Sequence, residues 1–210
     1  AAGDMAAVPH NYMLGAFTYG WFAGVRAAER ASAQALSAVD AEQVEAEKRR
    51  VYAPLLREHG LPPAQVEYKL RRFVNDYLQP PKVTRKYELG LKRFDEIGED
   101  IGQLHARDAH ELMRAMEVAV IRDCAEMAAR ASLFRTESRW GLYHLRTEFP
   151  ERNDAEWFCH AHLKKGDNGA MQHFKREVEP YIVPIEDEEM HAYDRLRIQA
   201  GRQAPEAQAA

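Results

Sequence analysis

A dense run of charged and hydrogen-bonding side chains lies between residues 137 and 154. Its members are Glu137, Ser138, Arg139, His144, Arg146, Glu148, Arg152 and Asp154. Arginine binds carboxylate, sulfate and phosphate groups through paired hydrogen bonds, so this run could hold an anionic substrate. The same residue types also form salt-bridge networks that fasten an irregular segment to a helical domain. Composition alone favours the structural interpretation, and both interpretations stay open for Arg139, His144 and Arg146.

Cys159, His160 and His162 form a second group of chemically capable side chains, with His144 nearby in the sequence. A zinc site needs four well-placed ligands, and residues two apart share a face only on a strand. The sequence contains no C-x-x-C and no H-E-x-x-H motif. We therefore expect no metal site and interpret these histidines as surface or partner-facing residues.

The first 24 residues, AAGDMAAVPHNYMLGAFTYGWFAG, combine glycines, aromatics and one histidine. Gly3 and Asp4 follow small residues, which is typical of a strand end that directs a carboxylate at sugar hydroxyls. A glycine-rich turn into a helix presents backbone N–H groups that can bind an anion or an electron-rich ring. A tight, buried turn would use the same residue types, so this stretch alone does not decide between the two.

Composition narrows the classes of partner. The 210 residues are 46% hydrophobic and 30% charged, with a formal net charge of -4. This balance is typical of a globular protein and gives no electrostatic reason to expect nucleic acid or an anionic membrane as partner. No apolar run approaches the ~20 residues that cross a bilayer, and the two cysteines suit reduced thiols in the cytoplasm. Because the sequence begins without a methionine, we expect a piece of a longer protein.

Apolar residues recur at helical spacing through most of the chain. They predict one helix from Gly15, rich in small residues, and four amphipathic helices over 40–58, 63–78, 84–104 and 108–134. Asp40 with Gln43, and Asp108 with Glu111, have the spacing of N-terminal capping boxes. The seam that we expect the last helix to bury consists of Met113, Met116, Val120, Cys124, Met127 and Ala131. Short connections predict an antiparallel four-helix bundle.

After Phe134 the helical periodicity stops. Residues 154–164 fit either a strand or a short helix, GDNG at 166–169 predicts a turn, and REVEPYIVPI predicts an exposed strand. The predicted fold class is therefore mainly α, with an extended C-terminal segment.

Two motifs together resemble one family. AAGD is similar to the second flavin-binding motif of the fumarate reductase, succinate dehydrogenase, aspartate oxidase and adenylylsulfate reductase flavoproteins, and PHNYMLGAFTYGWFAGVRAA fits the active-site loop and helix that follow it. ESRWGLYHLRTEFPERNDAEWFCHAHL resembles the family's segment ESRG-x-H-x-R-x-D-x-P-x-R-D-D-x-x-W, and KREVEPYIVP resembles the strand after it. The resemblance covers residues 1–187 and implies the C-terminal part of a longer FAD-dependent flavoprotein.

The resemblance also implies a division of the chain and roles for single residues. Residues 1–36 would be the C-terminal edge of an FAD-binding α/β domain, 37–135 the helical bundle, 136–187 the motif segment and 188–210 a flexible tail. Gly3 and Asp4 would bind the ribose or ribityl part of FAD, and His10 would be the catalytic residue at the substrate. The helix start at Gly15, Ala16 and Phe17 would lie near the isoalloxazine ring, where a helix N-terminus stabilises negative charge.

The loop around His10 favours one branch of the family. Succinate dehydrogenases and fumarate reductases carry a HGANR loop whose arginine grips a dicarboxylate, whereas here the first arginine after His10 is Arg26. PHNYMLGAFTYGWFAG aligns without a gap with the adenylylsulfate reductase loop GHKFSSGSFTEGRIA, and Arg139-Trp140 with Tyr143 resembles the same branch. Ala16 in place of a serine, and the bulkier residues 12–14, are departures from that loop.

The resemblance thus implies an enzyme subunit that converts adenylylsulfate to sulfite and AMP through a flavin adduct, with electrons from an iron–sulfur or ferredoxin-like subunit. A flavoprotein of the fumarate reductase or succinate dehydrogenase type, acting on a small acid, is the alternative. A non-catalytic helical interaction module is the third hypothesis. We expect a small anionic substrate, an inactive 210-residue piece, and a cytoplasmic location that reaches a membrane only through a partner.

Overall fold

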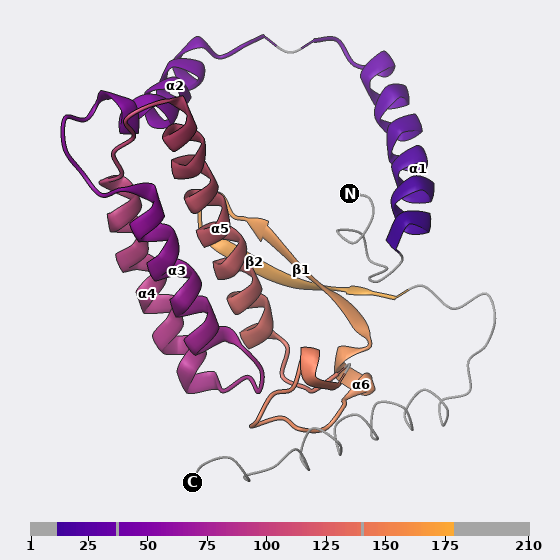
Figure 1. Ribbon diagram of the computed structural model, residues 1–210. Coiled ribbons are helices and arrows are strands. Elements are labelled where there is room, and N and C mark those ends of the chain that lie inside the picture. The colour runs from indigo at the N-terminus through magenta and orange to yellow at the C-terminus, as the bar shows by residue number, and fades with distance from the viewer. Residues whose placement is uncertain (1–11, 37, 140, 179–210) are drawn as a thin grey trace, which may run out of the picture. The chain divides into compact units, whose positions relative to one another are not determined.

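The computed structural model describes residues 12–36, 38–139 and 141–178 (Figure 1). Its elements confirm a mainly α fold, and they include a small two-stranded sheet. The chain divides into two compact units, Ala1–Lys48 and Arg49–Ala210. None of the described helices is both long enough and apolar enough to cross a membrane.

The first unit contains helix α1 (Tyr12–Ala33) and the beginning of helix α2 (Ala41–Leu56). Helix α1 begins three residues before the predicted start at Gly15, and most of its side chains are exposed. The predicted cap of α2 is present, because the Asp40 carboxylate accepts hydrogen bonds from the amides of Glu42 and Gln43 at 3.0 and 3.1 Å. These side-chain bonds replace partners that the first turn of a helix lacks.

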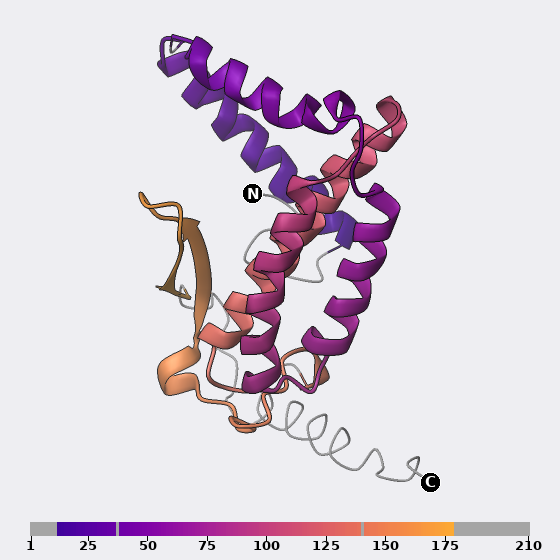
Figure 2. The same cartoon turned by 90° about the vertical axis from the view of Figure 1, so that its left-hand side faces the viewer.

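The second unit has its core between three antiparallel helices, α3 (Pro63–Leu78), α4 (Thr84–Gly102) and α5 (Ala109–Phe134), which lie side by side in Figures 1 and 2. Asp108 caps α5 as predicted, accepting from the amide of Glu111 at 2.8 Å. The buried cluster consists of Val66, Leu70, Phe73, Tyr87, Phe94, Ile97, Leu104, Ala115, Val118 and Ala129. Burial of these faces supplies the main stabilising free energy of the unit.

The predicted four-helix bundle differs in one respect from the structure. Helix α2 forms, but among its described side chains only Pro54 is buried, and the core cluster draws on none of them. The end of α2 is held by two hydrogen bonds: Ala106 N donates to Pro54 O at 2.9 Å, and the side-chain Nη1 of Arg57, just after the helix, donates to Leu104 O at 2.5 Å. The packed bundle therefore has three helices, with α2 attached by its end.

The predicted seam of α5 is wrong. Met113, Val120 and Met127 are 53%, 61% and 39% exposed, while Val118 is fully buried. The face that α5 buries consists of Leu112, Ala115, Val118, Glu126, Ala129 and Ser132. Apolar residues occur on more than one face of this helix, so periodicity alone selects the larger side chains, whereas close helix packing selects the smaller ones.

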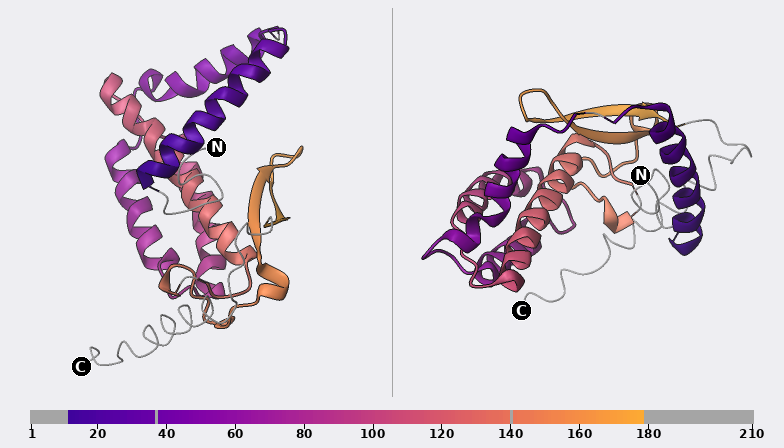
Figure 3. Two further views of the ribbon diagram at one scale, coloured as in Figure 1. Left: turned by 90° about the vertical axis from the view of Figure 1, so that its right-hand side faces the viewer. Right: turned by 90° about the horizontal axis from the view of Figure 1, so that it is seen from above.

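Residues after α5 form a short irregular segment, helix α6 (Asp154–Trp157), and a hairpin of strands β1 (Cys159–Lys165) and β2 (Met171–Glu177). Both alternatives for residues 154–164 are thus realised in succession. The hairpin is antiparallel, packs against α5, and turns at the predicted GDNG, where Gly169 has a φ of 79° that suits glycine (Figure 3). The predicted strand 176–185 overlaps only the end of β2, and its part beyond residue 178 lies outside the described residues.

Candidate functional site

The sequence-predicted site residues fall into two groups. Gly3, Asp4 and His10 lie outside the described residues, and Gly15, Ala16 and Phe17 lie in the first two turns of α1. The second group, Arg139, His144 and Arg146, lies in the irregular segment after α5. The two groups belong to different compact units of the chain.

Arg146 is 2% exposed, and its side chain caps the C-terminal end of helix α5. Its Nη1 donates to the carbonyl oxygens of Ser132 at 2.6 Å and Arg135 at 3.0 Å, and its Nη2 donates to Thr84 Oγ1 at 2.8 Å. The last carbonyls of a helix lack partners within the helix and carry the negative end of its dipole, so a cation is favourable there. The guanidinium therefore ties the C-terminus of α5 to the N-terminus of α4.

Glu137 has no exposed side-chain surface, and its carboxylate accepts four hydrogen bonds. Its carboxylate accepts from Arg135 Nη1 at 2.5 Å, Arg139 Nε at 2.7 Å, Arg139 Nη2 at 3.0 Å and the amide of Asn153 at 2.9 Å. A buried carboxylate is tolerated only when it is paired and its lone pairs are satisfied, which is the case here.

Arg139 extends this network to Asp154, whose Oδ1 also accepts from Arg152 at 2.8 Å. Burial by itself lowers the pKa of Arg139, but hydrogen bonds to Glu137 and Asp154 outweigh it and raise the pKa above its usual value. The guanidinium of Arg139 is thus shared between two carboxylates. This geometry supports the structural interpretation of Arg139 over a contact with an anionic substrate.

His144 is paired with Lys82, a residue that the sequence analysis did not single out. Lys82 Nζ donates to Ser132 Oγ at 2.9 Å and lies 3.2 Å from His144 Nδ1. Burial, reinforced by the charge of Lys82, lowers the pKa of His144 to about 4, and burial with Arg146 lowers the pKa of Lys82 to about 8. Near pH 7 His144 is neutral and accepts a hydrogen bond from the ammonium of Lys82, so these two side chains do not repel each other. Lys82 follows two prolines, and no spacing pattern pointed to it.

The start of α1 is where the sequence analysis placed the flavin ring. Its first turn contains no acidic residue, so nothing within the turn balances the positive end of the helix dipole. Gly15 is buried, whereas Phe17 is 73% exposed and Trp21 65% exposed. Within the described part of the chain, Gly20 leaves open space where a side chain would stand. An apolar, electron-rich group would fit the exposed aromatic side chains and the acid-free first turn of this helix.

The cysteine–histidine group lies on the hairpin. Within the described ranges, no three His, Cys, Asp or Glu side chains lie close enough together to hold a metal ion. The rings of His160 and His162 are 6.2 Å apart between centroids, and His162 stacks on Phe174 at 5.3 Å.

The family described as fumarate reductase flavoprotein C-term matches residues 67–192. No curated protein sequence matches the chain. Among solved structures, adenylylsulfate reductase from the hyperthermophilic Archaeoglobus fulgidus is 28% identical with a TM-score of 0.78, over 86% of this chain and 32% of that one. A complex of adenosine-5-phosphosulfate reductase with sulfite, described as a covalent adduct, gives the same values.

The E. coli quinol fumarate reductase flavoprotein, carrying an E245Q mutation, is 19% identical with a TM-score of 0.73, over 88% of this chain and 34% of that one. At that identity the likeness concerns the fold. The chain spans about a third of the length of each of these relatives.

Proposed function

Because this chain belongs to the family of fumarate reductase flavoprotein C-terminal domains, we propose that it is the C-terminal part of an FAD-dependent oxidoreductase of the adenylylsulfate reductase type. The family assignment confirms the resemblance seen in the motif that begins at Glu137, which lies inside the matched residues 67–192. Since the chain spans a third of its relatives, the activity, the substrate and the partners of the whole protein are part of the proposal. The observation that carries it is the match in sequence and fold to adenylylsulfate reductase over most of the chain.

FAD is the cofactor that the proposal requires. Gly3 and Asp4 would hold its ribose or ribityl part, and the α1 start at Gly15, Ala16 and Phe17 would face the ring. When bound, the flavin supplies the two-electron chemistry, and the protein supplies binding and orientation. The acid-free first turn of α1 supports this assignment, because a helix N-terminus there favours an electron-rich ring.

The proposed substrate is adenylylsulfate, converted to sulfite and AMP. His10 would contact it, and the absence of arginine between His10 and Arg26 argues against a dicarboxylate, whose charge needs a buried partner. The alternative, a fumarate reductase or succinate dehydrogenase type of subunit, rests on the shared fold. The electron donor would be an iron–sulfur or ferredoxin-like subunit.

The segment 135–154 would stabilise the fold rather than contact the substrate. Arg146 caps the C-terminus of α5, and Glu137 and Asp154 form ion pairs with Arg135 and Arg139. In the full-length protein this network would hold the hairpin and the bundle as one support for the flavin domain. We therefore assign Arg139, His144 and Arg146 a structural role.

The test uses the full-length protein that contains this sequence. We expect the purified protein to show a flavin absorbance spectrum that sulfite bleaches, and to oxidise sulfite with AMP and an artificial electron acceptor. Activity with succinate or fumarate and none with sulfite and AMP would favour the alternative subunit. A purified full-length protein without flavin would contradict both enzyme assignments.

A second measurement addresses the non-catalytic interaction module. We expect the 210-residue chain alone not to bind FAD tightly, because it carries one edge of the proposed binding site. Flavin fluorescence in a titration with the chain should therefore stay unquenched. Stoichiometric quenching would show that the chain by itself holds the cofactor.

A further inference from the structure

Helix α5 has apolar side chains on two opposite faces. The first face lies in the core of the second unit, where Val118 packs against α3 and α4, and Val120 lies about 200° from it around the helix axis. A helix that is apolar on all sides is normally covered on all sides. The second face, which we call the outer face, consists of residues at steps of three or four: Met113, Met116, Val120, Cys124, Met127 and Ala131.

The outer face is open to solvent in this structure. Met113, Val120 and Met127 are 53%, 61% and 39% exposed, and Cys124 is an exposed free thiol. Three of the seven methionines of the chain lie on this face, and methionine adapts its shape to an irregular neighbour. Because burial of apolar surface is favourable by about 25 cal/mol per Å², a contiguous apolar stripe of this kind marks an interaction surface.

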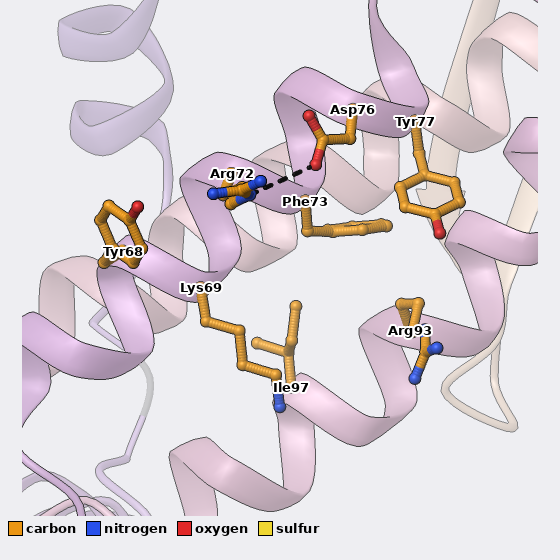
Figure 4. A pocket seen from close by; sticks show the side chains of 8 residues that line it. All are labelled: Tyr68, Lys69, Arg72, Phe73, Asp76, Tyr77, Arg93 and Ile97. Carbon is orange, nitrogen blue, oxygen red and sulfur yellow. Dashed lines mark ion pairs between the residues drawn. The ribbon is translucent and has the colours of Figure 1, made fainter.

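The surface formed by α3 and α4 differs from the outer face of α5 (Figure 4). Its apolar residues Phe73 and Ile97 are only 7% and 1% exposed. Each cation that lines it is paired with a carboxylate, in the pairs Lys69–Asp100, Arg72–Asp76 and Arg93–Glu96. The surface of α3 and α4 is therefore suited to water, whereas the outer face of α5 is suited to a packed neighbour.

The length of the relatives indicates what covers the outer face. The chain spans 32% of the adenylylsulfate reductase chain and matches a family of C-terminal flavoprotein domains. On the proposed function, about two thirds of the polypeptide therefore precedes residue 1. No residue of the outer face carries a charge, and permanent interfaces are more apolar than transient ones. A neighbour on the same polypeptide is permanent, so it fits this face better than a transient partner does.

We propose that the outer face of α5 is the surface on which the preceding, flavin-binding part of the same polypeptide packs. Apolar side chains of that part would cover Met113, Val120, Cys124 and Met127. This inference rests on the proposed function, because it requires a longer flavoprotein chain before residue 1. It adds the surface through which the helical bundle would support the flavin-binding part.

The thiol of Cys124 reports whether the outer face is covered. The test labels the full-length protein with N-ethylmaleimide and follows each cysteine by peptide mass spectrometry, with every rate divided by the rate in denaturant. The reference is a cysteine introduced by Arg85→Cys on α4, where the native side chain is 72% exposed. We expect Cys124 to react at least about tenfold more slowly than this reference, because a covered thiol reacts only during local opening.

A charge placed on the outer face gives a second readout. In Val120→Glu the new carboxylate lies one turn from Cys124 and would be buried without a partner, which weakens the packing. We expect Cys124 in the full-length variant to react about five- to tenfold faster than in the wild type. A nearby negative charge alone raises the pKa of a thiol and slows its reaction, so faster labelling reports uncovering. The control is Leu89→Glu on α4, where Leu89 is 37% exposed, and it should leave the labelling of Cys124 unchanged.

These measurements separate the inference from the proposed function, because flavin absorbance of the same samples tests the function and labelling tests the surface. Equal reactivity of Cys124 and the reference, with or without bound flavin, would overturn the inference, as would unchanged labelling in Val120→Glu. Protection of Cys124 that disappears on dilution would assign the outer face to a second copy and would also overturn it. Protection that persists without bound flavin would contradict the enzyme assignment and still support the packed surface.

Discussion

The guanidinium of Arg146 lies 2.6 Å from the carbonyl oxygen of Ser132, fourteen residues earlier in the chain. This contact places a buried cation at the end of α5, where the helix leaves its last carbonyls without internal partners. The amide of Arg146 in turn donates to Ser138 Oγ at 2.8 Å, and that hydroxyl donates to Phe149 O at 2.7 Å. The side chain of Arg146 therefore binds the end of the bundle, and its amide binds the motif segment.

Replacement of this side chain should destabilise the second unit strongly. Arg146→Met keeps an apolar stem of similar length but leaves the carbonyls of Ser132 and Arg135 without their donor. We expect a loss of about 3 kcal/mol in the free energy of unfolding, because charged hydrogen bonds contribute about 1.5–3 kcal/mol each and buried acceptors become unsatisfied. Urea denaturation followed by circular dichroism measures it. Arg71→Met on α3, with its side chain 64% exposed, is the control and should change stability by less than about 0.5 kcal/mol.

Glu137 offers a second test of the network. Glu137→Gln keeps the shape and removes the charge that pairs with Arg135 and Arg139. Arg135 then loses its carboxylate partner, and Arg139 keeps only Asp154. We expect a loss of about 3–5 kcal/mol, which is usual when one member of a buried ion pair is removed. The control is Glu96→Gln, since Glu96 forms a comparable but exposed pair with Arg93. Similar stability changes for both variants in thermal unfolding would show that the buried network contributes no more than a surface pair.

The sequence predicts the helices well because their boundaries have local causes. Asp40 and Asp108 cap the helices that they are predicted to begin, and α3 starts with Pro62 at its N-cap and Pro63 as its first residue. Gly60 has a cause that is not local, since a Cβ there would lie 2.3 Å from Gln103 O. Residue patterns along the chain therefore predict where helices begin and end, whereas they do not predict contacts between helices.

In the candidate site, too, the sequence predicts part of the residues and the tertiary structure supplies the rest. The polar residues between 137 and 154 were recognised as one group, but their partners Lys82, Thr84 and Ser132 come from distant parts of the chain. No spacing rule connects residue 82 with residue 144, because the bundle brings them together only after α4 and α5 have packed. The choice between substrate contact and structural role therefore needed the tertiary structure.

The corrected face of α5 can be tested with two valines that lie two positions apart. Val118 is fully buried and Val120 is 61% exposed, although the sequence pattern favoured Val120 as the buried one. We expect Val118→Ala to cost about 2 kcal/mol through lost burial and a cavity, and Val120→Ala less than about 0.5 kcal/mol. The two substitutions have the same effect on helix propensity, so their difference in urea midpoint reports packing alone. A larger effect at Val120 would restore the original seam.

The pair of His144 and Lys82 should make the second unit sensitive to acid. The pKa of His144 is lowered to about 4, mainly by burial and then by Lys82, so between pH 6.5 and 4 the unfolded chain binds a proton that the folded chain does not. Stability is therefore fully present above pH 6.5 and falls as the pH decreases toward 4, by at most about 3 kcal/mol for this group. His160 and His173 also have lowered pKa values and act in the same direction.

His144→Gln keeps a side-chain acceptor for Lys82 without a titrating ring, so its unfolding free energy should fall less between pH 6.5 and 4.5 than that of the wild type. Lys69→Gln, an exposed lysine change, is the control for altered net charge. Parallel pH profiles for His144→Gln and wild type would contradict the role assigned to His144.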